Sequence, residues 1–153
     1  MAMDRLKAID RMRGICSRKE CCRKEILEKL RKLEVEDPEG AVEQLCSENY
    51  INEARYAAAF VHDKSALQGW GILKIRLSLQ SKGIPSDIIA AALEEADADA
   101  ADSRLAELLS AKLRSLRGEQ DPQKRREKLF RYALGRGYSY DQIRRIYDSI
   151  RTN

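Results

Sequence analysis

Apolar residues recur three or four positions apart along most of this 153-residue chain, and no stretch shows sustained alternation with period two. A spacing of three and four places side chains on one face of an α-helix, whereas alternation is typical of a strand. The last run is the clearest, with Ile143, Ile146, Tyr147 and Ile150 at i, i+3, i+4 and i+7. The pattern therefore predicts an all-α protein.

Capping residues predict where several helices begin. Ser17 and Glu20 have the S-x-x-E spacing of a capping box and precede an apolar run, which predicts a helix start there. The Asp37-Pro38 pair is typical of an N-cap followed by proline at the first helical position. Asn52 is expected to cap the next helix.

A shift of 54 positions lays one part of the chain on another. Gly83 then falls on Gly137 and Asp87 on Asp141, and both glycines are expected to end a helix with positive φ. Chance agreement between leucine-rich helices is the alternative, but the shared glycine and aspartate favour repetition. A weaker match includes the first helix pair, without the glycine. We therefore expect three tandem three-helix repeats that form an elongated, curved array. The predicted division is an N-terminal lead-in segment at 1–15 and repeats at 16–66, 67–117 and 118–153.

Basic and acidic residues are segregated along the chain. Residues 1–32 carry a net charge of +6, 33–63 of −7, 64–93 of +3, 94–111 of −5 and 112–153 of +7. Segregation of this kind favours a partner that is steered by charge, such as nucleic acid or a charged protein surface. The alternative is that basic and acidic helices pair with one another inside the fold.

The residue types that carry chemistry are sparse. His62 is the one histidine, and its neighbour Asp63 is not expected to face it on a helix. Cys16, Cys21 and Cys22 crowd together without the CxxC spacing of a zinc site, so reduced thiols are expected. No glycine-rich phosphate loop follows a strand, and no apolar run is long enough to span a bilayer. The sequence predicts a protein that is not an enzyme and that needs no metal or cofactor.

The uncompensated basic residues are the candidate binding site. Lys124, Lys128 and Arg131 lie at i, i+4 and i+7, and Arg125 widens this stripe. Arg55 and Arg76 are ambiguous, because each could instead pair with a carboxylate at the edge of a packed face. Trp70, between two glycines, is either an exposed anchor or a packing residue. The complete set of candidate partner-binding residues is Lys124, Arg125, Lys128, Arg131, Arg136, Lys74, Lys82, Arg55 and Arg76.

Two strings in the middle of the chain, LCSENYINEARYAAAFV at 45–61 and GILKIRLSLQSKGI at 71–84, resemble the RecX family of bacterial regulators of the RecA recombinase. The segment RYALGRGYSYDQI at 131–143 is similar to the family's last helix junction. The resemblance extends over roughly residues 12–150. Asn52 stands where the family would have an acidic residue, and it can cap a helix equally well.

The resemblance implies a three-repeat, all-helical protein that lodges in the groove of a RecA filament on DNA, and the reduced thiols expected above fit a cytoplasmic location. It implies that recombinase, ATPase and co-protease activities are modulated, and mostly inhibited, in DNA repair and the SOS response. Direct binding of single- or double-stranded DNA through basic faces stays open, as do two rival functions. These rivals are a stand-alone helical DNA-binding protein and an adaptor scaffold for another client.

Overall fold

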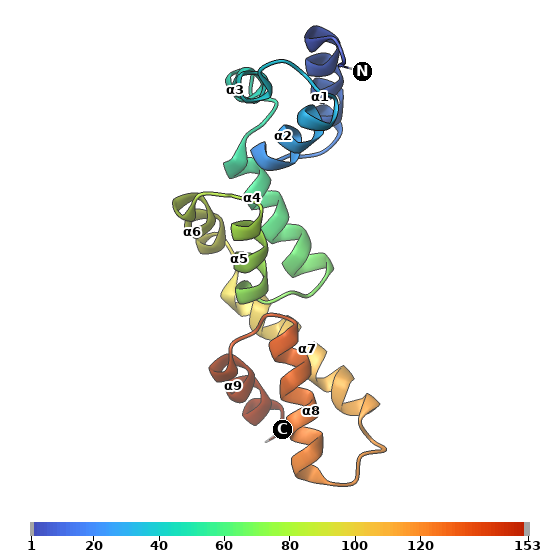
Figure 1. Ribbon diagram of the computed structural model, residues 1–153. Coiled ribbons are helices and arrows are strands. Elements are labelled where there is room, and N and C mark those ends of the chain that lie inside the picture. Colours follow the sequence, from blue (N-terminus) through green and yellow to red (C-terminus); the bar gives the residue numbers. More distant parts are fainter. Residues whose placement is uncertain (1, 152–153) are drawn as a thin grey trace. The chain divides into compact units, whose positions relative to one another are not determined.

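The computed structural model describes residues 2–151, and these residues form helices joined by turns and loops, with no strand (Figure 1). The all-α prediction is therefore confirmed. The helices of this part of the chain are α1 (Arg5–Arg18), α2 (Arg23–Lys32), α3 (Pro38–Ser47), α4 (Glu53–His62), α5 (Ile72–Ser81), α6 (Ser86–Glu94), α7 (Ala98–Ser115), α8 (Pro122–Gly135) and α9 (Tyr140–Arg151). A π-helical turn, η1 (Asp63–Leu67), follows α4 directly.

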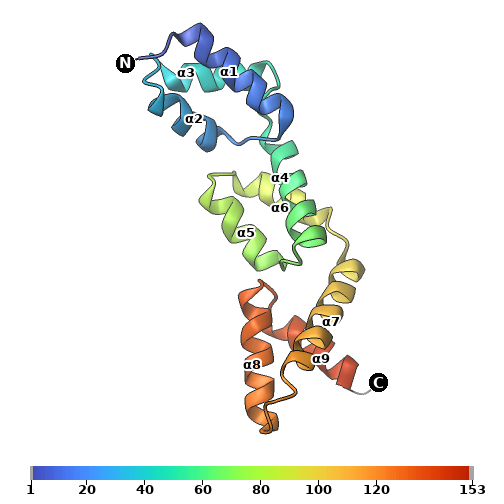
Figure 2. The same ribbon diagram turned by 90° about the vertical axis from the view of Figure 1, so that its right-hand side faces the viewer.

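The chain divides into two compact units. The N-terminal unit consists of Met1–Phe60 and Leu79–Ala92, and the C-terminal unit consists of Val61–Ser78 and Leu93–Asn153. In the N-terminal unit, α3 packs against α1 and α2 (Figure 2). Part of the predicted lead-in segment 1–15 is helical, because Ala8, Ile9 and Met12 of α1 are buried in the core of this unit.

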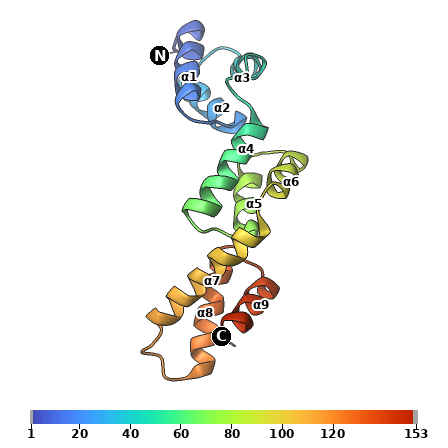
Figure 3. The ribbon, with the colours of Figure 1, turned by 180° about the vertical axis from the view of Figure 1, so that it is seen from behind.

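The core of the C-terminal unit is formed by α7, α8 and α9, each of which packs against the other two (Figure 3). Leu105 and Leu109 of α7 meet Leu129 and Ala133 of α8, and all four side chains are fully buried. Burial of a leucine side chain stabilises a fold by roughly 1.5–3 kcal/mol. The leucine run at 105–116 therefore holds this unit together.

The internal repeat is confirmed in the backbone. Helices α5 and α8 each end two residues before a glycine of positive φ, Gly83 at 75° and Gly137 at 101°. In both places the next helix begins three residues after the glycine. In the first helix pair the corresponding position, two residues after α2, is Glu34, which adopts a φ of 56°. The left-handed turn is thus kept in the N-terminal unit without the glycine that would reduce its strain.

Two of the predicted caps are confirmed and one is wrong. Asp37 accepts a hydrogen bond from Gly40 N (3.1 Å), and Asn52 accepts one from Arg55 N (3.0 Å). The capping box of Ser17 and Glu20 does not form. Ser17 lies inside α1, where its hydroxyl donates to Arg13 O (2.6 Å), because α1 continues through the position expected to start a helix.

Candidate partner-binding surface

The predicted basic stripe lies on α8. Asp121 begins this helix by accepting a hydrogen bond from Gln123 N (3.0 Å), and Pro122 occupies the first turn. Leu129 and Ala133 are fully buried, so the opposite side of the helix faces solvent. Lys124 and Arg131 are exposed, and neither side chain has a hydrogen-bond or ion-pair partner among residues 2–151. These two cations can meet an anionic partner without first breaking an internal contact.

The other two members of the stripe are already engaged by Glu119. Lys128 Nζ lies 2.7 Å from Glu119 Oε2, and Arg125 Nε donates to the Glu119 carbonyl oxygen (3.1 Å). The hydrogen bond from Lys128 lowers the pKa of Glu119, with smaller contributions from the Asp121 backbone N–H and from Arg125. Arg125 and Lys128 therefore hold the loop between α7 and α8, whereas Lys124 and Arg131 have no partner within residues 2–151.

Arg136 and Lys74 lie where α5 approaches the end of α8. Arg136 Nη2 donates to Gln68 O, while its Nε is buried without a partner in the described residues. Gly71 N donates to Arg136 O (2.8 Å), and Leu73 N donates to Gly137 O (3.0 Å). Both residues thus belong to a junction in which residues 68–74 pack against 136–138.

Trp70 is half-buried in this junction. The ammonium groups of Lys64 and Lys74 lie 4.8 Å and 4.2 Å from its ring centroid, which is cation–π distance. The Tyr138 hydroxyl donates to Gly69 O (3.0 Å), next to Trp70 in the chain. Of the two interpretations of Trp70, packing describes the structure better than an exposed anchor.

Arg55 and Lys82 are held within the N-terminal unit. The Arg55 Nε donates to the Glu20 carboxylate, and its Nη2 donates to the carbonyl oxygens of Asn49 (3.1 Å) and Tyr50 (3.4 Å). Lys82 Nζ lies 5.7 Å from the centroid of the Phe60 ring. Arg55 therefore fastens the start of α4 to the loop that precedes it and to the loop between α1 and α2.

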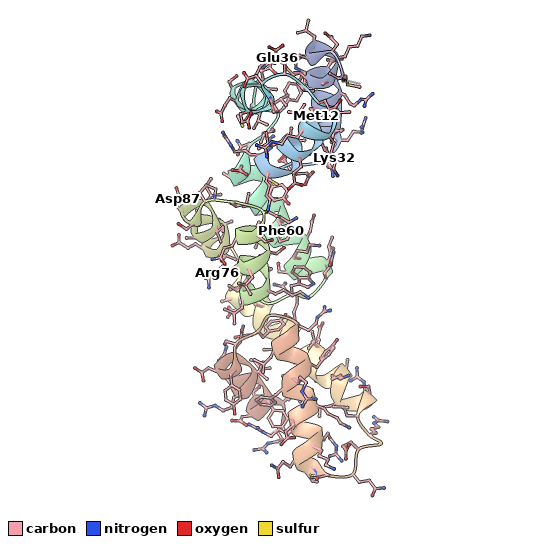
Figure 4. The ribbon with its side chains drawn as sticks, viewed as in Figure 1. Met12, Lys32, Glu36, Phe60, Arg76 and Asp87 are labelled. Carbon is pink, nitrogen blue, oxygen red and sulfur yellow. The ribbon has the colours of Figure 1, made fainter. Side chains whose placement is uncertain are left out.

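Arg76 does not pair with a carboxylate at the edge of a packed face, which was one of its two interpretations. It is exposed on α5, and no residue of 2–151 pairs with it (Figure 4). The reason is its position: Ile75 and Leu79 form the fully buried side of α5, and Arg76 lies outside that pair. Leu73 and Leu77 share the outer side and were missed as candidates. The sequence contains a signal for them. Leu73 and Leu77 precede Ile75 and Leu79 by two residues each, and a shift of two places them on the other side of a helix.

The acidic segment after α6 is structured by hydrogen bonds. Asp97 caps α7 by accepting from Asp99 N (3.0 Å), and Asp102 accepts two hydrogen bonds from Arg145 of α9 (3.0 and 2.9 Å). These hydrogen bonds lower the pKa of Asp102. Arg145 therefore joins α9 to the start of α7.

The described residues contain no group of three or more His, Cys, Asp or Glu side chains that could hold a metal ion. His62 Nδ1 does approach Asp63 Oδ1 (3.4 Å), contrary to expectation, but both side chains are largely exposed. Burial raises the pKa of the Cys16, Cys21 and Cys22 thiols, which disfavours the thiolate that a nucleophile needs. No helix within residues 2–151 is long and apolar enough to cross a membrane.

Comparison with known proteins agrees with this fold. Residues 52–93 match the second three-helix domain of RecX, and residues 101–147 match the third. These ranges coincide with α4–α6 and α7–α9, and the repeat boundaries at 67–117 and 118–153 stay a prediction. The crystal structure of a regulatory protein RecX superposes with a TM-score of 0.85 at 24% identity, covering 94% of this chain and 71% of that one. RecX from Lactobacillus salivarius gives 0.83 at 24% identity and covers 96% of both chains.

The sequence of this chain is also similar to those of known proteins over most of its length. The regulatory protein RecX of Clostridium botulinum is 37% identical over 107 residues, which are 69% of this chain and 50% of that protein. The regulatory protein RecX of Prosthecochloris aestuarii is 32% identical over 155 residues, which cover 98% of this chain and 97% of the relative. With both family domains matched and one relative aligned along almost its whole length, this chain belongs to the RecX family of regulatory proteins.

Proposed function

We propose that this protein binds RecA or RecA–DNA filaments in the cytoplasm. Binding would modulate, and mostly inhibit, the recombinase, ATPase and co-protease activities of RecA in DNA repair and the SOS response. The observation that carries the proposal is the alignment with a regulatory protein RecX along 98% of this chain. The helical repeat fold supports it, because each repeat presents exposed helix faces that can contact a partner.

The two unpaired cations of α8 support an anionic partner. Lys124 and Arg131 are exposed and have no partner in the part of the chain that the structure describes, so they lose little when they meet a phosphate or a carboxylate. A DNA-loaded filament offers both kinds of group. We therefore propose Lys124 and Arg131 as contact residues, and we interpret Arg125, Lys128, Arg136 and Arg55 as residues that first stabilise the fold.

The direct test measures ATP hydrolysis and strand exchange by RecA of the same organism on single-stranded DNA, with and without this protein. We expect both rates to fall as the protein is added. A matched titration with naked single-stranded DNA separates the proposal from the alternative of a stand-alone DNA-binding protein. Unchanged RecA rates together with tight binding of naked DNA would favour that alternative.

A further inference from the structure

Helix α5 has an apolar outer side in addition to its buried side. Ile75 and Leu79 are fully buried, whereas Leu73 is 43% and Leu77 67% exposed. Leu73, Arg76 and Leu77 lie at i, i+3 and i+4 and therefore share one face of the helix. Single exposed leucines are normal on a protein surface and need no explanation. Two exposed leucines that flank an exposed arginine form a contiguous group, and such a group calls for an explanation.

No negative charge on α5 neutralises Arg76. The helix reads ILKIRLSLQS and contains no aspartate or glutamate, and Arg76 has no ion pair within the described chain. The guanidinium is therefore available to a carboxylate from outside. Arginine is also among the residues that most often dominate the energetics of protein–protein interfaces.

The face is held in place before any partner arrives. Leu73 N donates to Gly137 O (3.0 Å), Gly71 N donates to Arg136 O (2.8 Å), and Gly71 is buried. These bonds fix the first turn of α5 to the end of α8. A surface that is already ordered loses less conformational entropy when it binds.

The chemistry of the face favours a protein over the sugar–phosphate backbone of a nucleic acid. Arg76 alone could meet a phosphate, but phosphates and sugars offer little apolar surface against which Leu73 and Leu77 could be buried. An apolar pocket with a carboxylate at its rim complements all three side chains. We propose that Leu73, Arg76 and Leu77, here called the α5 outer face, dock into such a pocket on the protein component of the filament. This inference rests on the proposed function.

The test compares binding of variants to RecA filaments assembled on single-stranded DNA. We expect Leu77→Ala to weaken binding about tenfold, since Leu77 is the more exposed of the two leucines. Leu73→Ala should add to that loss, and Arg76→Glu should abolish the remaining binding at moderate salt. Leu6→Ala and Arg11→Glu on α1 are matched controls, because Leu6 is 74% exposed and Arg11 is exposed and unpaired in the described residues.

Each variant is first checked for unchanged helicity and melting, which exposed positions should permit. Wild-type affinity in the α5 variants, or equal losses in the controls, would overturn the α5 outer face while leaving the proposed function intact. An equal loss of binding to naked DNA would overturn it as well. Sedimentation that shows a dimer broken by Leu77→Ala would assign the face to a second copy of this chain. Absence of wild-type binding to filaments would overturn both proposals.

Discussion

Adding a single methyl group at Gly83 or at Gly137 separates backbone strain from close packing. The two glycines occupy equivalent turns, and both have positive φ, which a Cβ makes unfavourable by roughly 1–2 kcal/mol. Alanine also lowers the conformational entropy of the unfolded chain, which offsets roughly 0.4–1 kcal/mol of the lost stability. A Cβ on Gly83 would meet nothing within 4 Å. We therefore expect Gly83→Ala to lower stability by about 1 kcal/mol or less.

Gly137→Ala should cost several times more. A Cβ there would lie 2.8 Å from Lys74 N and 2.9 Å from Gly71 O, closer than such atoms approach in proteins. These are backbone atoms, so relief requires the α5 junction to move, and overpacking of this kind costs roughly 1–3 kcal/mol. With the backbone strain included, the expected loss is about 3–4 kcal/mol. For a chain of this size that corresponds to a melting temperature lower by roughly 6–16 °C.

The assay is thermal and denaturant unfolding followed by far-ultraviolet circular dichroism and by tryptophan fluorescence. Trp70 is the one tryptophan of the chain and lies in the junction that Gly137→Ala disturbs. Gly135→Ala provides a control of opposite sign. Its Cβ would meet nothing within 4 Å, and it lies in the last turn of α8, where alanine is the better helix former. Equal effects at Gly83 and Gly137, or an unaltered Trp70 signal in Gly137→Ala, would refute the reasoning.

The remaining predictions concern charge, pH and thiols. Lys124→Glu with Arg131→Glu should flatten the plot of log affinity for DNA-loaded filaments against log salt by roughly 2, one for each lost phosphate contact, and an unaltered slope would exclude such contacts. Asp102→Asn should lower the melting temperature at pH 7. Arg145 lowers the folded pKa of Asp102, so its stabilisation is present above the ordinary value of 3.8 and is lost as pH falls through the folded value. The two proteins should then melt alike in acid, and a difference that persists there would contradict the role of the ion pair. Cys46 is the one partly exposed cysteine, and mass spectrometry after brief alkylation should find it labelled first.

Helices and repeats could be predicted from the sequence because they depend on local spacing. The apolar spacing of Ile143 and Ile146 depends on a few neighbouring residues. The same holds for the positive φ of Gly83 and Gly137. The false capping box shows where local reasoning ends. Ser17 and Glu20 satisfy the pattern, but α1 extends to Arg18, and Glu20 pairs with Arg55, which is 35 residues away. A contact over that distance leaves no trace in local spacing.

The sequence does not show which of the candidate basic side chains have internal partners, because the carboxylates that engage them lie far away in the chain. Arg55 and Arg76 look alike in the chain, each next to an apolar helix position. The structure pairs Arg55 with Glu20 and leaves Arg76 exposed. Lys128 and Arg131 share one stripe, yet Glu119 engages Lys128 and not Arg131. Charge counting identifies the helix that carries excess charge but not the side chains that stay available.

Ion pairs decide between the two explanations for segregated charge, and the decision differs between the two units. In the N-terminal unit the basic block 1–32 meets the acidic block 33–63 through three arginine–glutamate pairs, Arg13–Glu48, Arg23–Glu43 and Arg31–Glu39. Arg13 and Arg31 lower the pKa of Glu48 and Glu39 respectively. Much of the charge there is thus used within the fold.

The C-terminal unit is less balanced. Its acidic block 94–111 carries a net charge of −5, whereas its basic block 112–153 carries +7. Among the described residues, the ion pair between these two blocks joins Asp102 to Arg145. Lys124 and Arg131 stay exposed after this pairing. Exposed surface pairs contribute little to stability, so Lys124 and Arg131, which have no partner within residues 2–151, stay available to charges from outside at little cost to the fold. The anionic partner proposed above would account for two such cations on one helix, and we expect its contacts on α8.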